Sequence, residues 1–486
     1  VEAALARLAD RRQAMSLVAA NREVDGLLRD GIPVSYEDAQ GKTQQELLKL
    51  IDFSAEGVRR NAFLAVSQLW IKCTGPTALA DYRRPDVPLY VNGIPLVFLE
   101  LKNSNVKLKA AYSDNLANYK RDIPQLFIPN AFCVLSNAVE TRLGSLTGQW
   151  EHFFGWLRVH DEKEKIDRAQ IAEAGTSLER LVEGLCRPER LLDYVENFVL
   201  FHRETNKILA QNHQFIGVNH ALTQFEERHT RSGAERGKLG VFWHTQGSGK
   251  SFSMVFYVRK ILRKLRGNFT FVVVTDREDL DGQIYRNFLN TGTVKPQDVA
   301  QPRNSEELRK FLGLNKRLVF TLIQKFRYDK GAKYPVLSPR DDIVVIVDEA
   351  HRTQYKSLAE NMRAGLPNAS YLAFTGTPLL GRERKTNEWF GDYVSEYTFQ
   401  QSMEDGATVP LFYQKRVPEM LVQNEDLSEE FYQIVEDENL DEAQQEKLEK
   451  RFATEMQVIT RDDRLETIAV PRLREIQAVI ARHFKG

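Results

Sequence analysis

The chain has 486 residues, 67 of them basic and 67 acidic, with three cysteines and 42% hydrophobic residues. This length predicts two to four domains, and the ordinary apolar content excludes a disordered chain. Three scattered cysteines exclude a disulfide-rich scaffold, and no apolar run is long enough to cross a membrane, so we expect a protein of the reducing cytoplasm. The zero net charge does not exclude nucleic-acid binding, because a balanced sum can hide local charge.

The first half of the chain changes its periodicity several times. Residues 1–80 are expected to be mostly helical, because their leucines recur at helical spacings. Residues 85–101 are strand-like and contain the turn signal Asn92-Gly93, and residues 132–136 form another short apolar run. Residues 161–210 return to a helical, charge-rich pattern, which predicts a helical linker.

The strand-like segment carries charged side chains that require an explanation. Glu100 and Lys102 are two residues apart, so they share one face of a strand. A two-residue Asn92-Gly93 turn would place Asp86 opposite Leu99, on the wrong face. A three-residue loop would instead bring Asp86 to the shared face, diagonal to Glu100. We therefore predict a three-residue loop or a bulge.

On that shared face, Asp86 and Glu100 are predicted to bind Mg²⁺, which prefers oxygen ligands. The metal would activate water, and Lys102 would add positive charge beside the reacting phosphate. The alternative is a surface salt bridge between Glu100 and Lys102, because so short a pattern is common.

The second half of the chain alternates short apolar runs with amphipathic helical stretches. This alternation predicts a parallel sheet with helices on both faces. The runs are residues 240–243, 271–274, 318–322, 343–347 and 371–374.

The octapeptide HTQGSGKS, residues 244–251, follows the first of these runs and precedes an amphipathic helix. This is the context of a phosphate-binding loop, in which glycines let successive N–H groups wrap the phosphates. Lys250 would reach the β- and γ-phosphates, and Ser251 would ligate Mg²⁺. His244 stands where such loops usually begin with glycine. The residues expected to bind ATP here are Thr245, Gly247, Ser248, Gly249, Lys250 and Ser251.

The run 343–347 ends in the sequence DEAH, residues 348–351. Asp348 is predicted to hold Mg²⁺, Glu349 to orient and polarise the attacking water, and His351 to join the nucleotide site. Polar loops also follow three other strands, at the sheet edge where ligands bind in open α/β folds. These loops are residues 275–281, 321–326 and 374–378.

Together, the segments TQGSGKS, TDREDLDGQ, DEAH and FTGTP resemble the motifs of superfamily 2 helicases and translocases, and more closely the motor of type I restriction enzymes. The resemblance implies that Thr275, Thr375 and Thr377 contact DNA or couple it to the ATP site. It also nominates Gln214, in the segment NHQF, as the residue that reads adenine. An ordinary glutamine on a helix surface is the alternative for Gln214.

The segment RRPDVPLYVNGIPLVFLELKN resembles the nuclease segment of type I restriction subunits, a PD-(D/E)xK fold. Such nucleases often add a Gln-x-x-x-Tyr element downstream, for which the nearest match is Asn115 to Tyr119, with Asn in place of Gln. Gln68 falls where the family keeps a polar residue, and a core or capping role for it is equally open.

The resemblance implies an α/β chain with an endonuclease domain over residues 1–160, a helical linker over 161–210 and a first RecA-like domain over 211–400. Residues 401–486 would begin a second lobe or form a connecting segment. No later set of strands and loops resembles the second-lobe motifs, so we expect that lobe to be missing or truncated in a fragment of a longer protein.

The implied function is that of the ATP-dependent translocase and endonuclease subunit of a type I restriction–modification complex. It would use ATP and Mg²⁺, act on double-stranded DNA, and assemble with methyltransferase (modification) and specificity subunits. A stand-alone helicase–nuclease and a scaffold with decayed sites are the alternatives.

Charge is unevenly distributed along the chain. Residues 424–450 hold eleven acidic residues against two lysines, which is typical of a solvated helix or loop. Without this run the rest of the chain is basic, and we expect local, salt-sensitive phosphate contacts. The basic residues near the predicted sites are Arg83, Arg84, Arg259, Lys260, Arg263, Lys264 and Arg266.

Overall fold

The computed structural model describes residues 2–9, 15–37, 39–276, 278–314, 316–327, 334–348, 356–377 and 384–408. These residues belong to the first of the chain's two units, Val1–Val409. The acidic run 424–450 and nearly all of the expected start of a second lobe lie outside the described residues.

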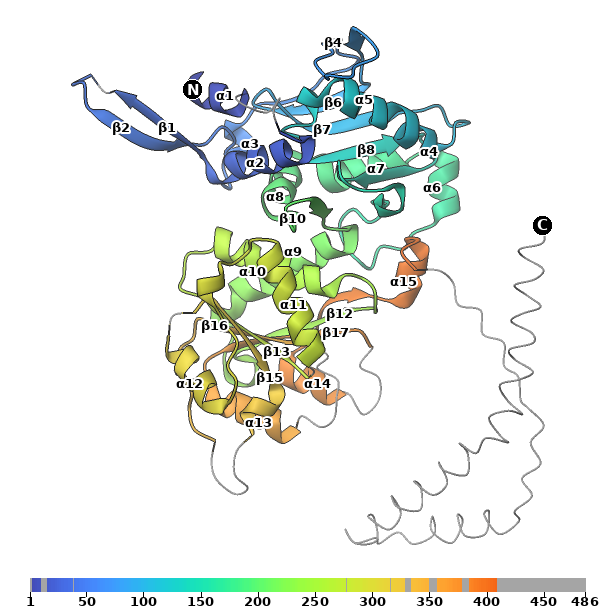
Figure 1. Ribbon diagram of the computed structural model, residues 1–486. Helices are drawn as coiled ribbons and strands as arrows, with labels where there is room; N and C mark the ends of the chain where they lie inside the picture. Colours follow the sequence, from blue (N-terminus) through green and yellow to red (C-terminus); the bar gives the residue numbers. More distant parts are fainter. Residues whose placement is uncertain are drawn as a thin grey trace, which may run out of the picture. The chain divides into compact units, whose positions relative to one another are not determined.

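The N-terminal region mixes helices and strands, so the prediction of a mostly helical start is wrong. Leu47 and Leu48 lie on a projecting hairpin (left side of Figure 1), where Leu47 is 66% exposed. Helical spacing of leucines predicted burial that these side chains do not have. The elements are α1 (Glu2–Ala9), α2 (Leu17–Asp30), β1 (Ile32–Glu37), β2 (Thr43–Leu48), α3 (Gly57–Arg60), β3 (Phe63–Ala65), β4 (Ile71–Lys72) and β5 (Tyr82–Arg83).

A five-stranded sheet follows, in the order β3-β6-β7-β8-β9. Strands β7 and β8 are parallel and the other neighbours are antiparallel. The predicted strands over residues 85–101 and 132–136 are thereby confirmed. The remaining elements of this region are β6 (Val87–Val91), β7 (Ile94–Leu101), α4 (Leu108–Ala110), η2 (Ala111–Leu116), α5 (Ala117–Asp122), η3 (Pro124–Leu126), β8 (Phe132–Ser136), β9 (Thr141–Gly144) and η4 (Trp150–His152).

The segment between the two sheets is mostly helical, as predicted, but it ends in a hairpin that the pattern does not reveal. The hairpin turns at Arg203 and Glu204, both with positive φ. Its elements are α6 (Arg168–Ala174), α7 (Ser177–Leu181), η5 (Val182–Cys186), α8 (Pro188–Asn197), β10 (Val199–His202) and β11 (Asn206–Leu209).

The second half of the described chain forms a seven-stranded sheet whose neighbouring strands all run parallel. Its order is β14-β15-β13-β16-β17-β12-β18, and all five predicted apolar runs are strands of it. The strands are β12 (Lys238–His244), β13 (Thr270–Thr275), β14 (Val299–Ala300), β15 (Leu318–Leu322), β16 (Ile343–Asp348), β17 (Ser370–Thr375) and β18 (Tyr393–Tyr397).

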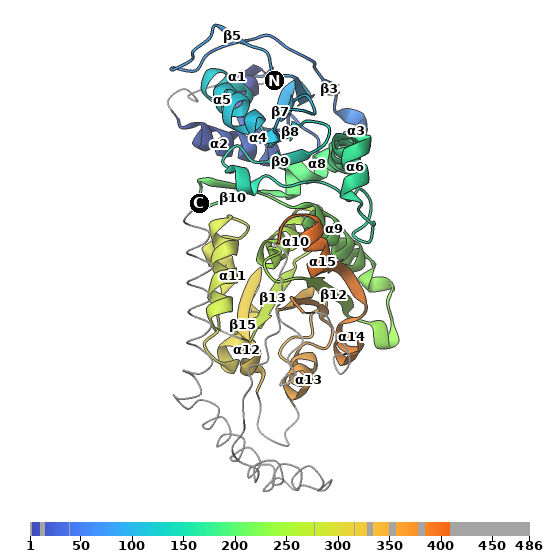
Figure 2. The ribbon, with the colours of Figure 1, turned by 90° about the vertical axis from the view of Figure 1, so that its right-hand side faces the viewer.

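Helices cover both faces of this sheet, as predicted for a parallel sheet (Figures 1 and 2). Alternate residues of β13 point to opposite faces: Val273 packs in the core with α9 to α11, and Val272 in the core with α12 to α14. The helices are α9 (Asn212–Glu226), α10 (Lys250–Lys264), α11 (Glu278–Asn290), α12 (Ser305–Gly313), α13 (Lys356–Gly365), α14 (Arg384–Phe390) and α15 (Phe399–Glu404), with short turns η6 (Glu227–Thr230), η7 (Gly233–Glu235), η8 (Pro296–Asp298) and η9 (Ile323–Phe326).

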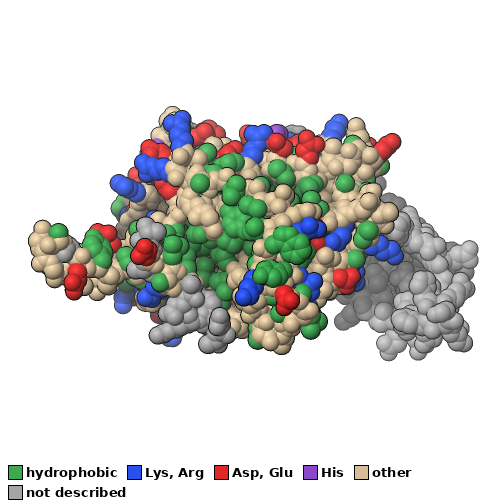
Figure 3. Space-filling model, turned by 90° about the horizontal axis from the view of Figure 1, so that it is seen from above, with side chains coloured by type: hydrophobic (Ala, Val, Ile, Leu, Met, Phe, Trp, Pro, Cys, Tyr) green, Lys and Arg blue, Asp and Glu red, His purple; other side chains and the backbone are tan. Residues whose placement is uncertain are grey.

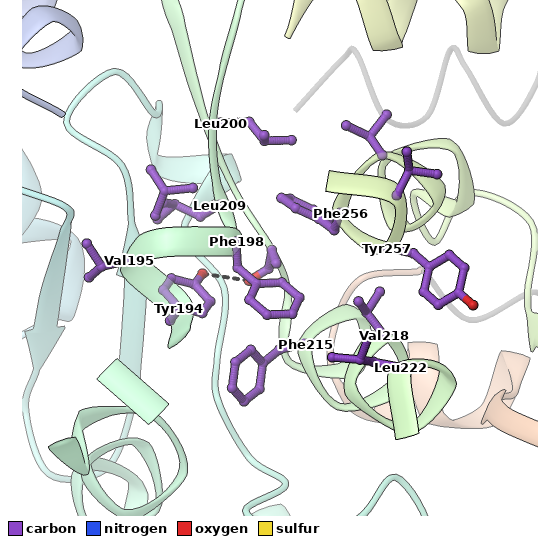
Figure 4. Close-up of a cluster of buried hydrophobic side chains, with 14 of the residues drawn as sticks. Tyr194, Val195, Phe198, Leu200, Leu209, Phe215, Val218, Leu222, Phe256 and Tyr257 are labelled. Carbon is purple, nitrogen blue, oxygen red and sulfur yellow. Dashed lines mark hydrogen bonds between the residues drawn. The ribbon is translucent and has the colours of Figure 1, made fainter. Parts of the chain in front are cut away.

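One hydrophobic core continues from the five-stranded sheet through α8 into the seven-stranded sheet. Figure 4 shows its centre, where Phe198 at the end of α8 lies between Phe215 of α9 and Phe256 of α10. Tyr194 is fully buried and donates a hydrogen bond to the carbonyl of Ala210 at 2.7 Å. The helical segment is therefore packed between the sheets. No helix among the described residues is both long enough and apolar enough to span a membrane.

Candidate functional site

The phosphate-binding motif lies between the end of β12 and the start of α10. Gly247 and Gly249 both have φ of 80°, a conformation that a β-carbon disfavours. These two left-handed residues curl the loop so that it ends at the N-terminus of α10, where helix N–H groups favour an anion. A β-carbon at Gly247 would meet nothing within 4 Å, so the loop is open on that side.

Two side chains of α9 contact the backbone carbonyls of this loop. His213 Nε2 lies 3.0 Å from the carbonyl oxygen of Ser248, and the Gln214 amide donates to the carbonyl of Gly249 at 3.0 Å. Gln214 Oε1 also accepts a hydrogen bond from the backbone N–H of Gln211. The Gln214 amide thus contacts the loop itself, and adenine reading by Gln214 stays a prediction. Nothing in the sequence pattern pointed to His213.

The other described residues predicted for the nucleotide site gather at the carboxyl ends of the same strands. Lys250 Nζ donates to the carbonyl oxygen of His244 at 3.2 Å. Asp348 is the last residue of β16 and is 8% exposed. The neighbouring strand β17 ends at Thr375. Thr245 directly follows the last residue of β12, and the half-buried Ser251 lies in the first turn of α10.

The proposed coupling threonines lie at this edge too. Thr275 is the last residue of β13, and the Thr375 hydroxyl accepts a hydrogen bond from the Thr377 N–H at 3.3 Å. Glu349 and His351 lie outside the described residues. The sheet edge therefore holds the described part of the predicted site.

His244, which replaces the usual first glycine, belongs to a buried polar network. Its Nε2 lies 2.6 Å from the Ser395 hydroxyl, which donates to Glu162 Oε1 at 2.5 Å. Burial raises the pKa of Glu162 to about 7 and lowers the pKa of His244. This network ties the segment after the first sheet to the start of the loop, and the sequence pattern gave no sign of it.

The register of β6 and β7 decides whether Asp86 can join Glu100. Asn92 and Gly93 form a two-residue turn that pairs Val91 with Ile94, so the predicted three-residue loop is wrong. The predicted bulge is confirmed, because the pairing shifts between Leu89 and Tyr90.

Beyond the bulge, Val87 pairs with Leu99, and continuing this register places Asp86 across from Glu100 rather than diagonal to it. Asp86 Oδ2 accepts a hydrogen bond from the Leu101 N–H at 2.8 Å. The extra residue on β7 therefore places Asp86 on the same face of the sheet as Glu100.

Glu100 is the electrostatic centre of this arrangement. It is 1% exposed, and burial raises its pKa to about 7, with the negative charge of Asp86 adding to the shift. Lys102 Nζ lies 2.8 Å from Glu100 Oε1, so the salt bridge considered above is present. Glu100 Oε2, however, is buried and has no hydrogen-bond partner among the described residues.

That unsatisfied oxygen next to a second carboxylate fits a divalent cation, which would supply the missing positive charge. The described residues contain no group of three or more His, Cys, Asp or Glu that could hold a metal. Ligands beyond Asp86 and Glu100 would then be backbone, water or substrate oxygens.

The three residues whose roles were open all lie beside this pair. The Tyr119 hydroxyl donates to the carbonyl of Arg84 at 3.3 Å, and burial raises its pKa to about 12. Asn115 is hydrogen-bonded to Tyr119. Gln68 has a φ of 51°, and its N–H donates to the carbonyl of Asp86 at 2.7 Å.

The basic residues of α10 make contacts within the protein. Arg259 and Lys260 are buried, bonded to the carbonyl of Val199 and to the carboxylate of Asp193. Arg263 and Lys264 donate to backbone carbonyls of residues 196 and 53. These bonds join α10 to its neighbours, and phosphate contacts by the basic residues stay a prediction.

Comparison with known families defines the class of protein. The sequence model for the SWI2/SNF2 ATPase family matches residues 213–446, which include the phosphate-binding loop. The model for the type I restriction enzyme R protein N terminus matches residues 2–152, which include the carboxylate pair. The chain is thus similar to the N-terminal domain of a restriction enzyme subunit, followed by a part similar to an ATPase domain.

Curated relatives make the identification more specific. The chain is 40% identical over 420 residues to the HindI type I restriction enzyme endonuclease subunit of Haemophilus influenzae, covering 82% of this chain and 38% of the relative. It is 33% identical over 463 residues to the putative MjaIXP type I restriction enzyme endonuclease subunit of Methanocaldococcus jannaschii, covering 91% and 43%. This chain is a homologue of type I restriction enzyme endonuclease subunits and spans about two fifths of the length of these relatives.

Solved structures offer weaker likeness. The UvsW helicase from bacteriophage T4 aligns with a TM-score of 0.31 and 12% identity, over 43% of this chain and 67% of that one. The ATP-dependent type ISP restriction–modification enzyme LlaBIII bound to DNA aligns with a TM-score of 0.30 and 16% identity, over 42% and 16%.

Proposed function

We propose that this chain is the nuclease and first motor lobe of the endonuclease subunit of a type I restriction–modification enzyme, which translocates double-stranded DNA with ATP and cleaves DNA that lacks the host modification. The observation that carries the proposal is the buried, unsatisfied Glu100 Oε2 beside Asp86, in a chain that also holds a complete phosphate-binding loop. The family relationships support both halves.

In the ATP half, the loop N–H groups and Lys250 would bind the β- and γ-phosphates, and Ser251 and Asp348 would hold Mg²⁺. Glu349 would orient and polarise the attacking water. The remaining half of an ATP site of this kind comes from a second lobe, so hydrolysis by these residues alone should be slow. Movement of Thr275, Thr375 and Thr377 with the strand ends would couple ATP to DNA.

In the nuclease half, Asp86 and Glu100 would hold a divalent cation that activates water and neutralises charge on the phosphate. Lys102 lies 2.8 Å from Glu100 and would place a second cation near the oxyanion that develops. Tyr119 holds the backbone of Arg84, and through it the start of β6, in place.

The relatives are named as endonuclease subunits, which supports assembly of this chain with further subunits. Nothing among the described residues resembles a module that reads bases, so methyltransferase and specificity subunits would select the DNA sequence. Since its substrate is intracellular DNA, the enzyme would work in the cytoplasm.

The test uses the subunit assembled with methyltransferase and specificity subunits on unmodified DNA. Glu100→Ala should abolish double-strand cleavage while ATP hydrolysis continues, because the two sites use different residues. Leu47→Ala, an exposed position on β2, is the matched control. Continued cleavage by Glu100→Ala would refute the nuclease assignment, and failure to co-purify with the other subunits would favour an enzyme acting outside a type I complex.

A further inference from the structure

An exposed tryptophan stands next to the carboxylate pair. Trp70 is 64% exposed, and Leu69 before it is 39% exposed. Large apolar side chains that are exposed next to one another often mark binding surfaces, and aromatic rings are frequent at such surfaces.

The partner of this tryptophan is an arginine. The Arg84 guanidinium carbon lies 5.1 Å from the centre of the Trp70 ring, which is cation–π distance. Arg83, its neighbour, is instead paired with the buried Asp122, and the two arginines beside Asp122 hold the pKa of that carboxyl well below its usual range. No carboxylate is paired with the Arg84 guanidinium in the part of the chain that the structure describes. Arg84 is therefore the member of this basic pair that can meet a ligand.

Backbone contacts fix this pair beside the proposed metal. Arg84 is two residues before Asp86, and its carbonyl accepts the Tyr119 hydroxyl. Gln68 donates its N–H to the carbonyl of Asp86, and Trp70 follows two residues later, so its Cα lies within about 7 Å of that of Gln68.

The left-handed φ of 51° at Gln68 is unusual for a residue with a side chain. It turns the chain between the backbone contact with Asp86 and the exposed Trp70. A backbone conformation held here, at the rim of the carboxylate site, is consistent with a positioned functional side chain.

We propose that Trp70 and Arg84 form a DNA-contacting pair at the rim of the nuclease site. Arg84 would bind a backbone phosphate next to the scissile one, and Trp70 would pack on the adjoining sugar or base. The pair deepens the proposed nuclease function and rests on it for the identity of the substrate.

Charge favours DNA as the occupant of this surface. Residues 66–84 carry three basic side chains and one acidic one, Asp81. Strand β4 lies at the top of Figure 1, and the view from above in Figure 3 shows hydrophobic side chains gathered on this face with Lys and Arg among them. An aromatic surface with basic side chains, beside two carboxylates that would hold a cation, matches a phosphodiester backbone.

The experiment measures binding of the chain to a short fluorescent DNA duplex by anisotropy, with Ca²⁺ replacing Mg²⁺ to prevent cleavage. Trp70→Ala should weaken binding about tenfold, and Trp70→Phe should restore most of it, because a stacking ring remains. Arg84→Ala should also weaken binding and reduce the dependence of affinity on salt by about one phosphate contact, and Arg84→Lys should restore that dependence. Tyr36→Ala, an exposed aromatic on β1, is the matched control and should bind normally.

Equal affinity of the Trp70→Ala and Tyr36→Ala chains, each shown to be folded by its thermal unfolding, would overturn the proposal. So would unchanged DNA binding together with lost binding to the specificity or methyltransferase subunit, since the surface would then contact protein. If Glu100→Ala still cleaves DNA but Trp70→Ala loses affinity, the DNA contact stands and the nuclease assignment fails.

Discussion

The phosphate-binding loop and the carboxylate pair are built in opposite ways. The loop is a continuous octapeptide whose two left-handed glycines and following helix create an anion site from local geometry. The carboxylate pair joins residues fourteen positions apart, and only a bulge in β7 brings them to the same face. A contiguous motif carries its own geometry, whereas a site spread over two strands depends on their register.

The two regions also have opposite electrostatic character. The loop presents N–H donors and a lysine, which await negative charge. At the carboxylate pair, Glu100 is buried, its pKa is raised and one of its oxygens has no hydrogen-bond partner among the described residues, so this region favours a cation. Each region is incomplete without its ligand, and the following experiments test that contrast.

The largest effect is expected at the loop. Lys250→Ala should lower the ATPase rate of the assembled enzyme by roughly a hundredfold or more, because the charge opposite the transferred phosphoryl group is lost. Lys310→Ala, an exposed lysine on α12, is the control. Unchanged turnover in Lys250→Ala would remove that residue from the ATP site.

At the carboxylate pair, a double-mutant cycle tests whether one ion is shared. Asp86→Asn and Glu100→Gln should each lower Mn²⁺ affinity roughly tenfold, because the number of charged ligands decreases. The double variant should bind little worse than either single one, since partners at one site do not act additively. Fully additive losses, measured by calorimetry, would show that the two carboxylates act separately.

Metal binding at this pair should also depend on pH. Because the pKa of Glu100 is raised to about 7, protons compete with the metal, and Mn²⁺ affinity should fall about tenfold for each pH unit below that value. The metal-free fold should correspondingly lose stability as pH rises from the ordinary range of a glutamate towards 7, since the folded state holds the proton more tightly. The range to measure runs from roughly two units below that pKa up to the pKa itself, about pH 5 to 7. A Mn²⁺ affinity that stays constant over this range would contradict the buried environment assigned to Glu100. Glu100→Gln should remove the pH dependence of the affinity.

The smallest effects separate the two basic clusters. Lys260→Ala should destabilise the fold by about 2 kcal/mol, because it leaves the Asp193 carboxylate without its partner in a mostly buried contact. Arg84→Ala should change stability by less than about 0.5 kcal/mol, because its guanidinium is at the surface. Urea unfolding of the two variants gives both values, and a reversed order would contradict the roles assigned to the clusters.

Much of this protein follows from sequence alone, where the signal is local. Buried strands of a parallel sheet are continuous apolar runs, so all five runs in the second half were recognisable, and Gly-x-Gly-Lys-Ser requires a particular backbone whatever surrounds it. The amphipathic helix after the loop is correct for the same reason, with Met254, Val258 and Ile261 fully buried.

The tertiary structure decided what depends on contacts between distant residues. The leucines of β2 have helical spacing, yet they lie on an exposed hairpin, because spacing does not say which side chains find a core. The basic face of α10 is occupied by the α8 segment, and His244 by Ser395 and Glu162. Above all, one extra residue in β7 determines where Asp86 points, because side chains alternate along a strand and a shift of one residue moves each of them to the opposite face.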